Sequence, residues 1–117
     1  GRLYVPVEDL RAQGCSEADL LAEAAASCHG VRSPQVHALL RQQAGGARDY
    51  YPRAARALPR AGRRCLVAAE IMGAIYRALL RRIERNGYDV FSRVVRIPRP
   101  RRAVIAAATW ARTILLP

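Results

Sequence analysis

"RRCLVAAEIMGAIYRALLRRIERNG", residues 63 to 87, carries the strongest periodic pattern in the chain. Its apolar residues recur at intervals of three and four, which places them on one face of a helix: Cys65, Ala69, Met72, Tyr76, Leu79, Leu80 and Ile83. The arginines of the same stretch fall mainly on the opposite side. Gly87 can adopt the left-handed conformation that ends many helices. The pattern predicts a long amphipathic helix over residues 63–86.

Two short helices are predicted before this stretch. Pro6 and the acidic residues that follow it indicate a helix over residues 6–13. Ser16 and Asp19 have the spacing of a weak capping box, which indicates a second helix over residues 17–28. The N-terminal end is therefore expected to be helical.

A longer helix is predicted from Ser33-Pro34 to Leu58-Pro59, by the same capping logic. Pro52 lies inside this segment and lacks an amide hydrogen, so we expect a kink or a break nearby. After Pro98 and Pro100 comes a final helix that is apolar over most of its circumference. No stretch alternates long enough to indicate a sheet, and the predicted fold class is all-α.

Length and composition limit the class of protein. The 117 residues suffice for one domain, or part of one, with a modest core. A hydrophobic content of 51% is too high for a disordered chain, and no apolar run reaches the ~20 residues of a membrane span. The net charge is +11 and all 20 basic residues are arginine. A diphosphate ligand, a nucleic acid and an anionic membrane would each suit this charge.

The sequence offers few candidates for a metal or catalytic centre. Its three cysteines are widely spaced, which fits neither a disulfide framework nor a zinc site, so we interpret them as reduced thiols. We interpret His29 and His37 as surface or capping residues. Asp19 and Glu23 lie four apart on one helical face, a geometry that can hold Mg²⁺ but is common on solvated helices. No metal site is assigned to this pair.

Two residues are notable for their surroundings. Tyr76 lies on the apolar stripe, so spacing alone predicts a core tyrosine whose hydroxyl needs a hydrogen-bond partner. Arg93 lies between Phe91 and Val94-Val95. An arginine in such semi-apolar surroundings needs an anion, from the protein or from a ligand.

Three arginine clusters, at residues 53–64, 77–85 and 93–102, could follow a nucleic-acid backbone. The aromatic residues are not interleaved with these clusters as a stacking platform would require, and a solvated basic face is the simpler interpretation. A non-catalytic basic helical module that binds nucleic acid or an anionic membrane stays open as an alternative function.

Four blocks, in order, resemble the squalene and phytoene synthase family, most of all its bacterial phytoene synthases. They are GRLYVP at 1–6, RDYYPRAARALP at 48–59, AIYRALLRRIERNGYDVFSRVVRI at 74–97 and PRPRR at 98–102. The resemblance covers nearly the whole chain but only the C-terminal portion of the family's usual length. It implies that residues 1–117 are a single partial domain, the C-terminal helices of an all-α isoprenoid synthase fold.

The resemblance also implies a reaction. Members of the family are prenyltransferases that condense two prenyl diphosphates head-to-head, and the expected product here is phytoene or a related product of isoprenoid or carotenoid biosynthesis, with geranylgeranyl diphosphate as the expected substrate. In the family, Mg²⁺ held by two aspartate-rich helices binds the diphosphates. Neither aspartate-rich motif occurs in this chain, which begins at the block that follows the second one. We therefore expect the metal ligands to lie outside the chain, and the chain alone to be inactive.

Four substrate-binding residues follow from the resemblance. Arg2 and Tyr4 lie in the first block, where a family tyrosine is near the diphosphates. Tyr76 is similar to the family tyrosine that lines the cavity, and Arg93 to an arginine that contacts a substrate diphosphate. The family often has a second arginine at the next position, where this chain has Val94. No residue of the chain is assigned as catalytic or as a metal ligand.

The location and partners are expectations of the same kind. The chain starts with Gly1 and has no signal peptide, so we expect it to derive from a longer, cytoplasmic protein. The expected partners are a prenyl diphosphate and the missing N-terminal portion, and no specific nucleic acid. The final helix either packs against helices outside the chain or rests on an anionic membrane as a peripheral contact.

Overall fold

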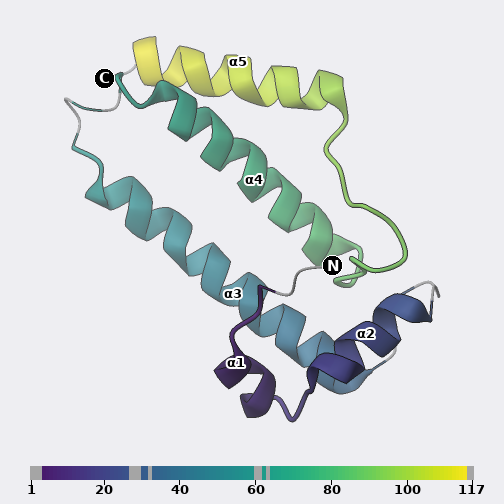
Figure 1. Ribbon diagram of the computed structural model, residues 1–117. Coiled ribbons are helices and arrows are strands. Elements are labelled where there is room, and N and C mark those ends of the chain that lie inside the picture. Colours follow the sequence, from purple (N-terminus) through teal and green to yellow (C-terminus); the bar gives the residue numbers. More distant parts are fainter. Residues whose placement is uncertain (1–3, 27–29, 32, 60–61, 63, 116–117) are drawn as a thin grey trace. The chain divides into compact units, whose positions relative to one another are not determined.

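The computed structural model describes residues 4–26, 30–31, 33–59, 62 and 64–115, and Figure 1 shows them as helices joined by turns. The helices are α1 (Val7–Ala12), α2 (Glu17–Ala25), α3 (Pro34–Ala57), α4 (Val67–Arg85) and α5 (Arg99–Leu115). The residues described contain no strand. The predicted all-α class is confirmed.

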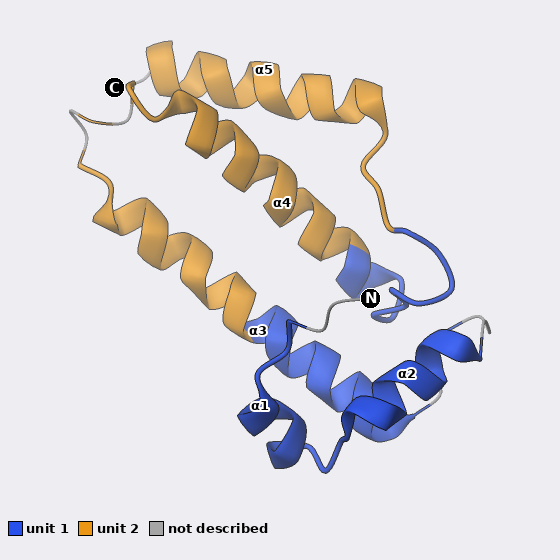
Figure 2. Cartoon of the chain, in the orientation of Figure 1, with its two compact units in different colours: residues 1–45, 83–94 blue, residues 46–82, 95–117 orange. Residues whose placement is uncertain are grey.

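The chain divides into two compact units, coloured separately in Figure 2. Unit 1 comprises Gly1–Gly45 and Ile83–Val94, and it contains α1, α2 and the first part of α3. Unit 2 comprises Gly46–Arg82 and Val95–Pro117, and it contains the rest of α3, most of α4 and the whole of α5. The single partial domain expected from the resemblance stays a prediction.

The core of unit 1 forms where α1, α2 and α3 pack together. Its buried residues come from all three helices and the turn between α1 and α2: Leu10, Cys15, Leu20, Val36 and Leu39. Half-buried residues pack against this core: Val5, Val31, Leu40 and Phe91. Val36 and Leu39 are fully buried and belong to the apolar stripe of α3. Removing such side chains from water supplies about 1.5–3 kcal/mol each.

The helix starts in unit 1 follow the predicted caps. The Ser16 hydroxyl accepts a hydrogen bond from the Asp19 amide (3.2 Å), and the Asp19 carboxylate accepts one from the Ser16 amide (2.7 Å), which completes a capping box. The Ser33 hydroxyl accepts a hydrogen bond from the Val36 amide (3.3 Å) at the start of α3. These bonds satisfy amide groups that the first helical turn leaves free.

Of the kink or break expected near Pro52, the break does not occur. Helix α3 runs continuously from Pro34 to Ala57 with Pro52 inside it. A proline removes one amide donor, but the turns on either side keep their own hydrogen bonds and continue the helix. One turn later, the Arg56 Nε donates a hydrogen bond to the Pro52 carbonyl oxygen (3.2 Å).

Unit 2 is held by contacts between helices rather than by a large buried core. The Arg77 guanidinium on α4 lies over the Tyr51 ring of α3, 5.1 Å from its centre. The Arg64 Nη2 donates a hydrogen bond to the Ile114 carbonyl oxygen near the end of α5 (3.3 Å). A cation at this position also interacts favourably with the negative end of the helix dipole.

Helix α4 begins at Val67, later than predicted, and none of its residues is buried. On its apolar stripe Met72 is 55% exposed and Tyr76 is 54% exposed. The stripe predicted from spacing is therefore present but only partly covered in this chain. None of the helices within the described residues is long and apolar enough to cross a membrane.

Candidate functional site

A pocket of about 320 Å³ lies within unit 2, between α4 and the chain that leads into α5. Its lining residues are Ile75, Tyr76, Leu79, Val95, Arg96, Ile97 and Arg102. Leu79 follows Ile75 by four residues and Tyr76 by three, so the α4 residues share one face of the helix. Residues 95–97 form the opposite wall, and Arg102 comes from the first turn of α5. The pocket combines an apolar floor with two guanidinium groups.

The turn that follows α4 belongs to unit 1. Gly87 (φ 71°) and Tyr88 (φ 63°) both adopt left-handed conformations. The left-handed conformation was predicted for Gly87. At Tyr88 it is uncommon, because a side chain disfavours it. The Tyr88 amide donates a hydrogen bond to the Ile83 carbonyl oxygen (2.9 Å), and its ring meets the His37 ring edge-on, with centres 5.1 Å apart. These contacts offset the backbone cost at Tyr88.

The buried side chain of Asp89 stabilises the turn that follows α4. It is 6% exposed, and its carboxylate accepts hydrogen bonds from the Ser92 hydroxyl and the Ser92 amide (3.1 Å to the amide). The Asn86 side-chain amide donates to the Asp89 carbonyl oxygen (3.1 Å). The hydrogen bonds from Ser92, followed by those from the Gly30 and Phe91 amides, lower the pKa of Asp89, although burial opposes this shift. Asp89 therefore has a structural role.

This pKa shift predicts how stability depends on pH. Because the folded-state pKa of Asp89 is below its unfolded value, its contribution is complete above the unfolded pKa and is lost as the pH falls through the folded one. Ser92→Ala removes the largest cause of the shift. We expect this variant to be less stable than the wild type at pH 7, and to lose less further stability on acidification. Urea unfolding followed by circular dichroism at pH 7 and pH 3 measures both effects.

The Asp89→Asn background is the control for this pH dependence. In that background, adding Ser92→Ala should leave the pH dependence unchanged, because the titrating carboxylate is already gone. If the wild type and Ser92→Ala lose the same stability on acidification, the hydrogen bond from the Ser92 hydroxyl does not stabilise the ionised Asp89 carboxylate.

Of the four predicted substrate-binding residues, the structure places Tyr76 in the pocket. It is half-exposed there, so the core position predicted from spacing alone is not observed. Tyr4 and Arg93 belong to unit 1 and are exposed, and Arg2 lies outside the described residues. As a substrate-binding set, these four residues stay a prediction.

Two lining residues were missed in the sequence. Arg96 and Arg102 belong to the cluster interpreted as a solvated basic face, and both are exposed at the pocket. The sequence does contain a signal for Arg96. This arginine lies between Val95 and Ile97, so its side chain has apolar neighbours on both sides along the chain. Nothing comparable in the sequence distinguishes Arg102 from the arginines beside it.

The arrangement suits an amphiphilic phosphate ester. A guanidinium group forms paired, charge-assisted hydrogen bonds with phosphate oxygens. The Tyr76 hydroxyl can donate a further hydrogen bond, while Ile75 and Leu79 offer an apolar surface to a hydrocarbon chain. The pocket can therefore hold a charged head group and the start of an apolar tail.

The described residues do not fit a magnesium site. No group of three histidine, cysteine or acidic side chains that could hold a metal occurs among them. The Asp19 carboxylate is engaged by Ser16, and the Glu23 Oε1 accepts a hydrogen bond from the Ser33 amide (2.6 Å). The interpretation of this pair as ordinary helix residues agrees with these roles.

The other metal-binding residue types have structural surroundings. Cys15 and Cys65 are free thiols, the first buried and the second exposed, and burial is the main cause that raises the pKa of Cys15. His37 contacts Tyr88. Cys28 and His29 lie outside the described residues.

Comparisons with known proteins identify the family. The family model described as squalene/phytoene synthase matches residues 1–114. The 15-cis-phytoene synthase of Synechocystis is 30% identical over 116 residues, which are 99% of this chain and 32% of the relative. That of Synechococcus elongatus is 33% identical over 119 residues, covering 100% of this chain and 32% of the relative.

A chloroplastic phytoene synthase 3 of Zea mays is 25% identical over the whole chain and 26% of its own length. No solved structure is significantly similar to the chain. The chain thus spans about a third of the length of the two bacterial relatives. Because the family match extends over almost every residue, the chain belongs to the squalene/phytoene synthase family.

Proposed function

We propose that the chain forms part of a phytoene synthase-type prenyltransferase, which condenses two prenyl diphosphates head-to-head in carotenoid biosynthesis. Geranylgeranyl diphosphate is the proposed substrate. The observation that supports this proposal best is the pocket in which Arg96, Arg102 and Tyr76 lie beside apolar side chains. A prenyl diphosphate has the same two parts, a polyanionic head and a hydrocarbon tail.

The pocket residues would act on the leaving group and on the tail. Negative charge develops on the diphosphate as its bond to the allylic carbon breaks, and guanidinium groups held beside an apolar wall stabilise that charge. Ile75 and Leu79 would keep water from the carbocation that remains. The proposal keeps Arg2, Tyr4 and Arg93 as further substrate-binding residues, on the strength of the family resemblance alone.

Mg²⁺ is the cofactor that the family implies, and it would supply additional positive charge to the diphosphates. Since the described residues provide no ligand set for it, no step is assigned to the metal in this chain. Its proposed ligands lie in the part of the protein that corresponds to the unmatched length of the relatives. The proposal also includes a cytoplasmic location and association with that remaining part.

The test joins residues 1–117 to the part of the Synechocystis relative that this chain does not match. With Mg²⁺ and geranylgeranyl diphosphate, the chimera should form phytoene, whereas residues 1–117 alone and the Synechocystis portion alone should form none. Product is measured by extraction and chromatography, and circular dichroism establishes that each protein is folded.

Two outcomes would contradict the proposal. A folded chimera without product, combined with salt-sensitive binding of RNA by residues 1–117, would favour the non-catalytic basic module. Turnover by residues 1–117 alone would mean that the metal ligands are within this chain.

A further inference from the structure

The turn that follows α4 is anchored to the rest of unit 1 at two points. The buried Asp89 carboxylate accepts hydrogen bonds from the Ser92 amide (3.1 Å) and hydroxyl, and also from the Gly30 amide in the connection between α2 and α3. Phe91 packs against the core that α1, α2 and α3 form. The hydrogen bonds to Asp89 lower its pKa despite its burial, which indicates that they favour the ionised carboxylate. The backbone from Asp89 to Ser92 is therefore held in one conformation.

Arg93 is the first residue after this anchored turn. It is exposed, whereas Asp89 is only 6% exposed. A side chain on a fixed backbone loses less freedom when it binds a ligand, so rigid supports make binding sites more precise. Tyr4, another proposed substrate-binding residue of unit 1, has the same arrangement, since it is 82% exposed and its neighbour Val5 packs against the same core. Arg93 and Tyr4 thus both adjoin residues that are anchored in unit 1.

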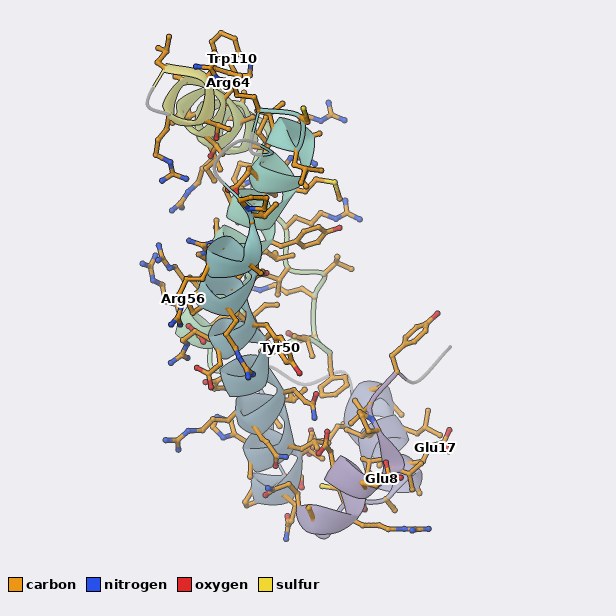
Figure 3. All side chains as sticks on the ribbon, turned by 90° about the vertical axis from the view of Figure 1, so that its left-hand side faces the viewer. Glu8, Glu17, Tyr50, Arg56, Arg64 and Trp110 are labelled. Atoms are coloured by element: carbon orange, nitrogen blue, oxygen red, sulfur yellow. The ribbon has the colours of Figure 1, made fainter. Side chains whose placement is uncertain are left out.

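Most carboxylates of unit 1 already have a role in its folding. Those that accept hydrogen bonds from donors inside the unit are Asp9, Asp19, Glu23 and Asp89. Glu8 and Glu17 belong to the first turns of α1 and α2, where the positive end of the helix dipole stabilises them, and both are exposed (Figure 3). The anion that Arg93 needs is therefore expected from a ligand.

We propose that Asp89 and Ser92 are positioning residues, which fix the backbone at Arg93 so that its guanidinium is presented to a diphosphate in one orientation. The inference rests on the proposed substrate-binding role of Arg93. A guanidinium forms paired hydrogen bonds with phosphate oxygens only when its plane is correctly oriented. A misplacement of about 1 Å can cost about a hundredfold in rate. Asp89 and Ser92 would act through Arg93 and not touch the substrate themselves.

The test is a double-mutant cycle in residues 1–117, with inorganic pyrophosphate as the probe and isothermal titration calorimetry as the measurement. Arg93→Gln should weaken binding about tenfold or more, and Ser92→Ala about threefold to tenfold. In the Arg93→Gln background, Ser92→Ala should change the dissociation constant no more than about twofold, because no guanidinium remains to be positioned. Ser92→Thr keeps the hydroxyl and should bind pyrophosphate as the wild type does.

Ser16→Ala is the matched control. The Ser16 hydroxyl donates a hydrogen bond to the Asp19 carboxylate (2.7 Å) in the same unit, so this variant removes the same kind of bond at a site distant in sequence from Arg93. It should lower stability, because it removes a helix cap, and leave pyrophosphate binding almost unchanged. Equal weakening by Ser16→Ala and Ser92→Ala would overturn the proposal.

Two further results would also overturn it. One is unchanged pyrophosphate binding in Arg93→Gln, and the other is a cycle in which the effects of Ser92→Ala and Arg93→Gln multiply. If circular dichroism shows that Ser92→Ala does not fold, Asn86→Ala takes its place in the cycle, because it removes the hydrogen bond to the Asp89 carbonyl oxygen in the same turn.

The chimera with the Synechocystis portion separates this inference from the proposed function. In an active chimera, Ser92→Ala should divide its effect between kcat and KM as Arg93→Gln does, and the two changes together should be no worse than Arg93→Gln alone. A chimera without product, combined with the expected pyrophosphate cycle, would contradict the proposed function and support the positioning role. A chimera that forms phytoene but in which the two effects multiply would overturn the positioning role and leave the proposed function intact.

Discussion

Replacing both Arg96 and Arg102 by glutamine is expected to weaken the binding of a prenyl diphosphate at least about a hundredfold. Hydrogen bonds to charged groups contribute about 1.5–3 kcal/mol each, and both guanidinium groups line the same pocket. Glutamine retains much of the length and polarity, so the loss would report on charge. Isothermal titration calorimetry of residues 1–117 with geranyl diphosphate, a water-soluble short-chain probe, measures the dissociation constant.

The control for the pocket arginines is Arg99→Gln with Arg101→Gln. These neighbours belong to the same basic cluster but do not line the pocket, and their replacement changes the net charge by the same amount. We expect this control to weaken binding only slightly, through the general field of unit 2. If both pairs weaken geranyl diphosphate binding equally, the attraction is non-specific and the pocket is not the binding site.

Replacing Leu39 by alanine is expected to lower the free energy of unfolding by about 2–5 kcal/mol. Leu39 is fully buried in the core of unit 1, so its truncation removes apolar contact and leaves a cavity that the helices fill only in part. Such a loss is a large fraction of the stability of a small protein. Urea unfolding followed by circular dichroism measures it.

Leu21→Ala is the matched control for the core. Leu21 lies on α2 of the same unit but is 62% exposed, so the same chemical change should alter stability by no more than about 0.5 kcal/mol. Similar losses for Leu39→Ala and Leu21→Ala would mean that the core of unit 1 is not organised around Leu39.

The helical elements were predictable because their signals are local. The Ser16 and Asp19 side chains and the backbone amides that they cap lie within one turn of helix, and Gly87 needs only its own conformational freedom. Prediction was less reliable where two local effects compete. Pro52 is tolerated inside α3 because the neighbouring turns of a long helix outweigh one lost hydrogen bond.

The candidate site was only partly predictable. Tyr76 could be singled out from its spacing and from the family resemblance, but spacing alone assigned it to the core. Its exposure depends on what packs against α4, which is not a property of α4. Asp89 gave no advance signal of its buried role either, because that role depends on a backbone turn that brings Ser92 and Gly30 to its carboxylate.

What the amino-acid order alone settled was the all-α class, the helix starts, the left-handed end of α4 and the family resemblance, since each depends on neighbours along the chain. Packing decided which arginines share a pocket with Tyr76 and which apolar faces stay exposed. The reason is physical: periodicity shows that a helix has an apolar face, but what covers that face depends on residues distant in sequence. Arg96 and Arg102 are therefore separated from the other arginines by position in space and not by any feature of the residues themselves.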